Sequence, residues 1–222
     1  MPHPAAELLN RARQAHKQER FADAETDLLT AVEICRDSGD RGALAVALRQ
    51  LGEAQRHLDN AANALKSYEE AVTLMRSDAE PQRLAHTIRH LGDVYEEPGE
   101  PDLVRPCYKE ALAMYRSDEQ SNPMNVANAV RAFAVHLYDA GELERSMPLW
   151  EEARATYRSF GIHAGVAGCS VRLARVARHQ CDDALVQQCL VEAKAAAAES
   201  GEDDTLAYVK SMAKELAWKN RD

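Results

Sequence analysis

The chain has 222 residues, of which 45% are hydrophobic and only 5% aromatic, and its formal net charge is −9. Strands favour β-branched and aromatic residues, so this composition favours helices. Phosphate binding requires a basic surface, and the negative charge therefore argues against a general binder of nucleic acid or anionic membranes. The sequence contains no apolar run of transmembrane length and no signal-peptide pattern at the N-terminus, so we expect a soluble, cytoplasmic protein.

Taken in chain order, the sequence predicts helices in antiparallel pairs, with the weakest pattern in the first pair. In the second pair, apolar residues near helical spacing predict a helix over residues 44–57. The segment "HLDNAA" breaks this pattern, and Asn60 is the expected N-cap of a second helix that runs through Met75. Three similar pairs follow, and "LAYVKSMAKELAWKNRD" ends the chain as one more amphipathic helix.

Glycines and prolines mark particular places in the later pairs. Gly99 and Gly141 occupy equivalent breaks between helices, where a tight turn often needs the positive φ that glycine allows. Pro106 and Pro148 both fall early in a second helix. Because proline lacks a backbone donor, we expect those two helices to kink or to begin late.

The pairs are copies of one repeat of 40 to 42 residues. The segment "LRQLGE" at residues 48–53 returns as "IRHLGD" at residues 88–93. Two positions recur along the chain at this period. An aliphatic residue followed by alanine holds the first position, and an alanine holds the second, with a large side chain three residues before it. The first position is held by Leu44-Ala45, Leu84-Ala85, Val126-Ala127, Val166-Ala167 and Leu206-Ala207, and the second by Ala31, Ala71, Ala111, Ala153 and Ala193. A fixed period of this size indicates stacked repeats.

This pattern resembles the tetratricopeptide repeat (TPR) family. The second copy carries Leu51-Gly52, Ala64, Tyr68 and Ala71 at the family's positions. Glycine costs about 1 kcal/mol inside a helix, so we expect a neighbouring helix to approach Gly52 and its equivalent Gly92 closely. The resemblance implies an all-α fold, an α-solenoid of five hairpins and a C-terminal capping helix in one domain over residues 1–222. The expected repeats are residues 4–40, 41–80, 81–122, 123–162 and 163–203, with the capping helix at about 204–220.

Two features depart from the usual TPR pattern. The period exceeds the common 34 residues, and in this it is similar to the long repeats of kinesin light chain and of bacterial regulatory TPR proteins. In addition, an arginine replaces the usual closing proline; these arginines are Arg36, Arg76, Arg116 and Arg158. We expect them to stabilise the C-terminal ends of the second helices, where a cation is favoured by about 0.3–1 kcal/mol.

The resemblance also implies a binding groove lined by the first helices, which commonly holds a peptide. The residues expected to line it are Arg13, Arg49, His86, Arg89, Asn128, Arg131, Tyr138, Arg172 and Arg175. Arginine forms bidentate bonds with carboxylates, so these side chains suit a protein or peptide partner with an acidic segment. The alternative is that repeat duplication has copied arginines that lie on solvated helix faces.

Local charge differs along the predicted groove. Glu53 follows Arg49 by one helical turn, and Asp93 follows Arg89 in the same way. Arg131 has Val135 at that spacing, and no acid stands four residues after the later arginines Arg172, Arg175 and Arg178. We therefore expect the fourth and fifth repeats to form the more positive part of the groove.

The remaining residues do not indicate catalysis or metal binding. The five cysteines form no Cys-x-x-Cys pair, and no phosphate-binding glycine loop is present. His86 and His90 have His-x-x-x-His spacing, and we interpret them as polar residues on a first helix, where they are candidates for ligand contact. We therefore expect a non-enzymatic protein- or peptide-binding scaffold without a cofactor or metal. The alternatives are a regulatory sensor that controls a partner's activity in response to a bound peptide, an enzyme, and self-association through exposed repeat faces.

Overall fold

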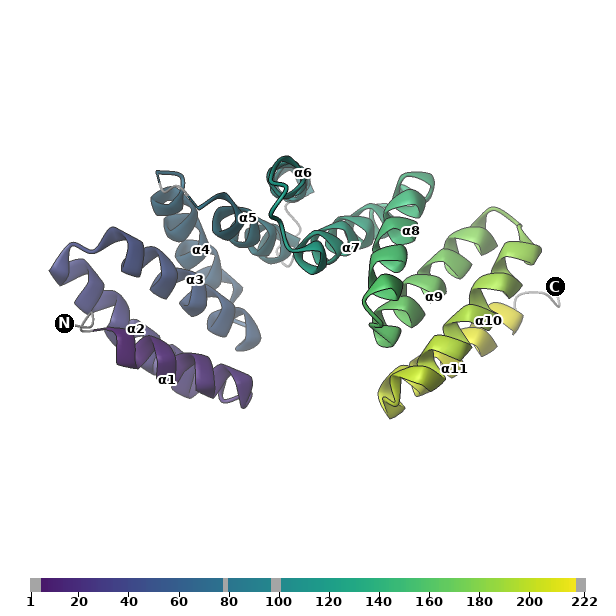
Figure 1. Cartoon of the computed structure of the whole chain (residues 1–222), viewed down its shortest axis with the longest axis horizontal. Helices are drawn as coiled ribbons and strands as arrows, with labels where there is room; N and C mark the ends of the chain where they lie inside the picture. The colour runs from purple at the N-terminus through teal and green to yellow at the C-terminus, as the bar shows by residue number, and fades with distance from the viewer. Residues whose placement is uncertain (1–4, 78–79, 97–100, 219–222) are drawn as a thin grey trace. The chain divides into compact units, whose positions relative to one another are not determined.

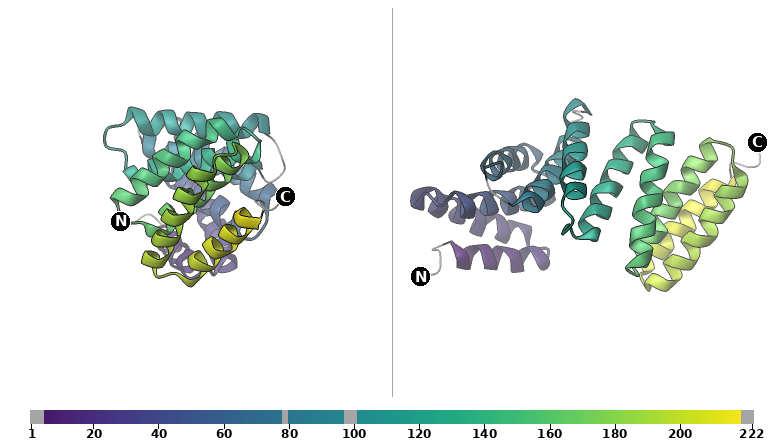
Figure 2. Two further views of the ribbon diagram at one scale, coloured as in Figure 1. Left: turned by 90° about the vertical axis from the view of Figure 1, so that its right-hand side faces the viewer. Right: turned by 45° about the horizontal axis from the view of Figure 1, so that its top comes forward.

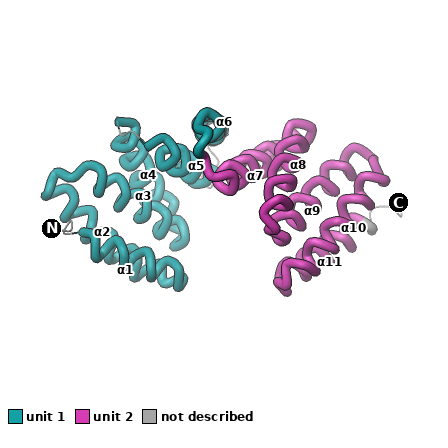
Figure 3. The backbone as a smooth tube through the Cα atoms, viewed as in Figure 1, with its two compact units in different colours: residues 1–120 teal, residues 121–222 magenta. Residues whose placement is uncertain are grey.

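The computed structural model describes residues 5–77, 80–96 and 101–218, and within these ranges it contains eleven α-helices and no strand (Figure 1). The all-α prediction is therefore confirmed. Within the same ranges, every helix is too short or too polar to cross a membrane. The chain forms two compact units, residues 1–120 and residues 121–222, which we call unit 1 and unit 2 (Figure 3). The predicted single domain over residues 1–222 stays a prediction.

Unit 1 contains three helical pairs. Its helices are α1 (Ala6–Lys17), α2 (Phe21–Ser38), α3 (Arg41–His57), α4 (Ala61–Met75), α5 (Pro81–Glu96) and α6 (Pro101–Ser117). Each helix packs against the next one along the chain. In addition, α3 contacts both α1 and α5, so the first helices of successive pairs are neighbours within this unit. This is the packing expected of stacked helical repeats.

Unit 2 contains two further pairs and the C-terminal helix. Its helices are α7 (Pro123–Asp139), α8 (Leu143–Ser159), α9 (His163–His179), α10 (Asp183–Ser200) and α11 (Asp203–Trp218). Figure 2 shows them, green to yellow, packed side by side. Helix α11 contacts both α9 and α10, so it lies where the first helix of another pair would lie and covers the end of the unit, as predicted.

The repeated small and large residues form the core. Every alanine at the second repeated position is fully buried, and the large side chain three residues before it is buried as well. These large side chains are Leu28, Tyr68, Tyr108, Trp150 and Leu190. Small residues at fixed positions allow two helices to approach, and the large residue on the same helix fills the space beside the contact. The register read from the sequence is therefore correct.

The glycines inside helices α3 and α5 are explained by aromatic rings packed against them. A Cβ atom at Gly52 would lie 2.8 Å from Cδ2 of Tyr68, and one at Gly92 would lie 3.1 Å from Cε1 of Tyr108. The expectation of close packing at both glycines is confirmed. Gly165 in α9 follows the same rule, because its Cβ would lie 2.7 Å from Cγ of Tyr157.

The helix boundaries follow local signals in most places. The side chain of Asn60 accepts a hydrogen bond from the backbone N–H of Asn63 and caps α4, as predicted. Gly141 has a φ of 79°, which confirms the expected left-handed turn, whereas Gly99 lies outside the described residues.

Of the two outcomes expected at Pro106 and Pro148, the late helix start is wrong, and the kink stays a prediction. Helix α6 begins at Pro101 and α8 begins at Leu143, so each helix starts five residues before its internal proline. A proline removes one backbone hydrogen bond, and burial of Tyr108 and Trp150 just after the two prolines favours the continuous helix.

The C-terminal helix buries different residues from those expected. The sequence suggests Tyr208, Met212, Leu216 and Trp218 as the residues that cover the last repeat. Val209 and Leu216 are buried, whereas Tyr208 is 39% exposed and Met212 is half-buried. The side chain of Trp218 lies outside those described. Tyr208 is thus available for contact at the surface.

Candidate functional site

In unit 1, the two arginines predicted to be neutralised are indeed paired. The guanidinium of Arg49 lies 3.5 Å from the carboxylate of Glu53, and that of Arg89 lies 3.1 Å from Asp93. Arg13 donates a hydrogen bond to the side chain of Asn10 at 3.2 Å. Arg49 and Arg89 therefore have little charge left for a ligand.

Asp93 is the centre of a buried polar network on α5. The ring of His90 lies 3.2 Å from its carboxylate, and the hydroxyl of Tyr108 donates to it at 2.8 Å. Burial alone would raise the pKa of Asp93, but its hydrogen bonds with His90 and Tyr108 and the charge of Arg89 hold it below its usual value. The network is internally satisfied and stabilises α5 against α6.

His86, another predicted groove residue, lies beside this network. Its ring packs edge-on against that of His90 at 4.6 Å between centroids. Burial, together with repulsion from His90 and Arg89, lowers the pKa of His86 to about 3. His86 is therefore neutral at physiological pH and adds no positive charge to the surface.

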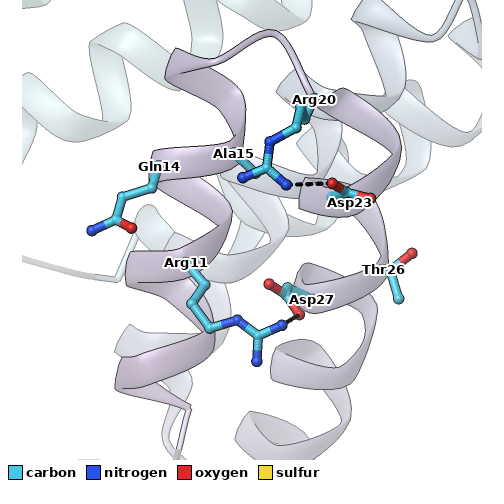
Figure 4. Close-up of a pocket in the computed structure, with 7 residues that line it drawn as sticks. All are labelled: Arg11, Gln14, Ala15, Arg20, Asp23, Thr26 and Asp27. Atoms are coloured by element: carbon cyan, nitrogen blue, oxygen red, sulfur yellow. Dashed lines mark hydrogen bonds and ion pairs between the residues drawn. The ribbon is translucent and has the colours of Figure 1, made fainter.

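Two cavities of unit 1 contain acids as well as cations. One, of about 250 Å³, is lined by Arg13, Lys17 and Arg49 but also by Glu53. The other, of about 260 Å³, lies between α1 and α2 and is shown in Figure 4. There Arg11 pairs with Asp27 at 2.9 Å and Arg20 pairs with Asp23 at 2.5 Å. In both cavities, carboxylates of the chain itself offset the positive charge.

Unit 2 contains a cavity of about 400 Å³ with a different character, which we call the unit 2 pocket. Helices α7, α8, α9 and α11 and the turn before α9 supply its walls. Among the described residues, its lining includes two arginines and no acid. The lining residues are Met124, Asn128, Arg131, Val135, Trp150, Tyr157, Ile162, Ala164, Gly165, Gly168, Cys169, Arg172 and Tyr208. Three of the predicted groove residues, Asn128, Arg131 and Arg172, therefore lie around one cavity.

Neighbouring side chains orient two polar groups of the unit 2 pocket, Asn128 and Arg172. The hydroxyl of Tyr157 donates to the amide oxygen of Asn128 at 2.7 Å, which leaves the amide nitrogen as a donor. The guanidinium of Arg172 lies over the ring of Tyr138 at 5.4 Å, a cation–π contact that orients the charge without cancelling it. Arg131 is exposed. Among the described residues, neither arginine has a carboxylate within ion-pair distance.

The expectation that Arg175 and Arg178 also lack acidic neighbours is wrong. Arg175 lies 3.1 Å from Glu215 and also donates to the sulfur of Met212, both on α11. Arg178 lies 2.5 Å from Asp183 and donates to the backbone carbonyl of Leu216. Most of these partners are distant in sequence, so the absence of an acid four residues on did not reveal them. Arg175 therefore links α9 to α11, and Arg178 links α9 to both α10 and α11.

The arginines that replace the closing proline lie at the C-terminal ends of the second helices, as predicted, and three of them have a further role. Arg36 on α2 pairs with Glu70 on α4, and Arg76 at the end of α4 pairs with Glu110 on α6, both at 2.7 Å. Arg158 on α8 pairs with Glu192 on α10 in the same way. These three pairs tie the second helices of successive repeats together within each unit. Each of these glutamates stands one position before a repeated alanine, so the sequence contained a regular pattern that could have predicted the ion pairs.

Sequence reasoning missed Gly168 and Tyr208, although the repeat register relates both to Asn128. These three residues are spaced by 40 and occupy the same position in successive first helices. All three line the unit 2 pocket, and so does Ile162 in the turn before α9. Counting 40 residues on from Asn128, and then 40 more, would have found Gly168 and Tyr208. No repeat position of a predicted site residue pointed to Ile162.

Comparisons with known proteins agree with this architecture. The family model described as tetratricopeptide repeat matches residues 4–77 and 44–117, just over half of the chain together. No curated protein matches the chain. Among solved structures, a putative kinesin light chain of Podosopora anserina with nearly identical TPR-like repeats has a TM-score of 0.72 at 15% identity, covering 91% of this chain and all of that one.

Two further structures carry functional descriptions of their own. YrrB, a TPR protein with an unusual peptide-binding site, has a TM-score of 0.59 at 17% identity, covering 94% of this chain and 93% of that one. The apo form of the quorum sensor NprR from B. thuringiensis has a TM-score of 0.72 at 17% identity, covering 91% of this chain and 56% of that one. At such identities these likenesses establish the solenoid fold alone. The family model, however, matches more than half of the chain, and the repeated alanines and large side chains are buried as this family requires. This chain therefore belongs to the tetratricopeptide repeat family.

Proposed function

We propose that the protein is a non-catalytic scaffold that binds a protein or peptide segment, and that the unit 2 pocket binds an acidic part of that segment. One observation carries this proposal. Arg131 and Arg172 line a pocket in which no described lining residue is acidic, in a chain whose net charge is −9. A local positive site on a negative protein has a natural complement in a carboxylate.

The chemistry of the pocket fits such a ligand. Each guanidinium offers paired N–H donors that match a carboxylate, and the amide nitrogen of Asn128 adds a neutral donor. Because the chain otherwise carries excess negative charge, an acidic segment is repelled from most other surfaces. The ligand therefore gains selectivity from repulsion elsewhere as well as from attraction at the pocket.

The remaining predicted groove residues contribute less under this proposal. Arg49, Arg89 and Arg175 are already paired with acids of the chain, and His86 is neutral. Tyr138 acts indirectly, because its ring holds Arg172. The net charge also supports the proposal that the protein binds neither nucleic acid nor anionic membrane surfaces.

The family supports a role in protein interaction, since TPR arrays are generally non-catalytic scaffolds. A regulatory sensor is the second candidate, and one observation favours it. Tyr208 lines the pocket from α11, while Glu215 and Leu216 of the same helix contact Arg175 and Arg178 of α9. A ligand in the pocket would therefore contact α11, and a second protein could respond to a displacement of this helix.

The test is a selection of random dodecapeptides, displayed on phage, on the immobilised protein. We expect enrichment of peptides that contain Asp or Glu, and we expect this enrichment to disappear on the Arg131→Ala/Arg172→Ala variant. The matched control is Arg36→Ala/Arg76→Ala, which also removes two arginines but breaks ion pairs in unit 1. Acidic enrichment that survives in the first variant and is lost in the control would contradict the assignment of the site.

A further inference from the structure

Gly168 is a glycine inside a helix that internal packing does not explain. Glycine destabilises the interior of a helix relative to alanine because it gains no side-chain contacts and loses more backbone entropy. At Gly52, Gly92 and Gly165 a tyrosine ring occupies the space where a Cβ would lie. At Gly168, among the described residues, no atom of another element lies within 4 Å of that position. The residue lines the unit 2 pocket, so the space beside it belongs to the pocket.

Exposed apolar side chains surround the same pocket. Ile162 is 41% exposed and Tyr208 is 39% exposed, and both line the pocket together with the half-buried Met124 and Val135. Exposed apolar groups scattered singly are ordinary, but several around one cavity indicate a contact surface for an apolar group. The pocket thus offers apolar contacts as well as the two unpaired guanidinium groups.

We propose that the unit 2 pocket binds a peptide segment in which a large apolar side chain stands close to an acidic residue, and that Gly168 determines this specificity. The apolar side chain, such as that of Leu, Ile, Met or Phe, occupies the space left by the missing side chain of Gly168 and contacts Ile162 and Tyr208. The acidic residue pairs with Arg131 or Arg172. This inference rests on the proposed function and specifies its ligand.

The dimensions and composition of the pocket agree with this ligand. A cavity of about 400 Å³ is within the range of small-molecule and side-chain sites, about 300–1,000 Å³. A purely acidic ligand would leave Ile162 and Tyr208 in water, and a purely apolar ligand would leave both arginines without a counter-charge. A mixed apolar and acidic segment satisfies both sets of groups at once.

The experiment extends the dodecapeptide selection to a Gly168→Leu variant. On the unaltered protein we expect enriched peptides to carry a large apolar residue at a constant distance from Asp or Glu. The Leu side chain fills the space beside the helix, so Gly168→Leu should lose the apolar preference and keep the acidic one. The matched control is Gly42→Leu, the same change at a helical glycine of α3 whose Cβ would meet only Asp40 Oδ1, at 3.6 Å.

Affinities of two synthetic peptides make the result quantitative. One is the most enriched dodecapeptide, and the other is the same peptide with its apolar residue replaced by Ala. Burial of a large apolar side chain corresponds to roughly a tenfold or greater difference in affinity, which the unaltered protein and Gly42→Leu should both show. Gly168→Leu should bind the two peptides within about threefold of each other. Circular dichroism checks that each variant is folded.

The possible failures are distinct. If enriched peptides carry acids without an apolar residue, and Gly168→Leu binds them as the unaltered protein does, this inference is wrong and the proposed function stands. If acids are not enriched, or if Arg131→Ala/Arg172→Ala leaves their enrichment unchanged, the proposed function is wrong and this inference falls with it.

Discussion

The guanidinium of Arg175 lies 3.1 Å from the carboxylate of Glu215, and this ion pair joins α9 to α11. The same guanidinium donates to Met212, and Arg178 reaches the backbone of Leu216 nearby. The C-terminal helix therefore uses two arginines that the sequence assigned to a ligand or to the surface beside it. Among the arginines that line the unit 2 pocket, Arg131 and Arg172 remain available to a partner.

Burial, more than the ion pair, should hold α11 in place. Glu215 is 45% exposed on its side chain, so Glu215→Ala should lower the free energy of unfolding by less than about 1 kcal/mol. Leu216 is buried, and Leu216→Ala should cost about 2–5 kcal/mol through lost burial and the cavity left behind. Urea denaturation followed by circular dichroism measures both. A larger loss from Glu215→Ala than from Leu216→Ala would show that charge dominates.

Two glycine-to-alanine changes should have opposite effects. A Cβ at position 52 would lie 2.8 Å from the Tyr68 ring, so we expect Gly52→Ala to destabilise unit 1 by about 1–3 kcal/mol through overpacking. Gly168→Ala places its methyl group in open space, so it should stabilise α9 by up to about 1 kcal/mol. Thermal and urea denaturation of the two variants test this, and equal effects would contradict the packing described.

The half-buried histidine His86 should make stability depend on pH. Its pKa is about 3 in the folded chain, whereas an unfolded chain takes up this proton near pH 6.5. Between these values the unfolded state binds more protons, so stability falls as the pH is lowered from about 6.5 towards 3. From pH 7 to pH 5 we expect a loss of about 2 kcal/mol from this residue. His86→Gln should flatten the profile, and an unchanged slope in urea titrations would exclude His86 as its source.

The arginines should differ in their importance for acidic peptides. Arg131→Ala/Arg172→Ala should weaken binding by about 2–5 kcal/mol if the ligand carboxylates are desolvated, because unpaired charges then remain. Arg175→Ala should weaken it by less, since Glu215 already neutralises that guanidinium. Calorimetry with a selected dodecapeptide measures both, and higher salt should weaken binding to the unaltered protein. A greater loss from Arg175→Ala would move the site toward α11.

The repeat register, and with it the fold, could be predicted from the spacing of residues along the chain. Periodic small and large residues predicted the buried Ala71 and Tyr68, and Asn60 predicted a helix start, because these features depend on spacing along one helix or on a single turn. The glycine at position 52 was also interpretable, since only a close contact offsets its helical cost. Such signals are local, and the repetition of the same pattern strengthened each of them.

Which charged side chains are paired, and where cavities lie, depends instead on how the helices pack together. Arg175 and Glu215 are separated by 40 residues, and Arg36 and Glu70 by 34, so their pairing depends on which helices pack together. In the same way, the face of α11 that packs against the rest of unit 2 buries Val209 and places Tyr208 at the unit 2 pocket. Charge neutralisation and cavities arise from side chains of several helices at once, and a pattern along one helix does not specify them.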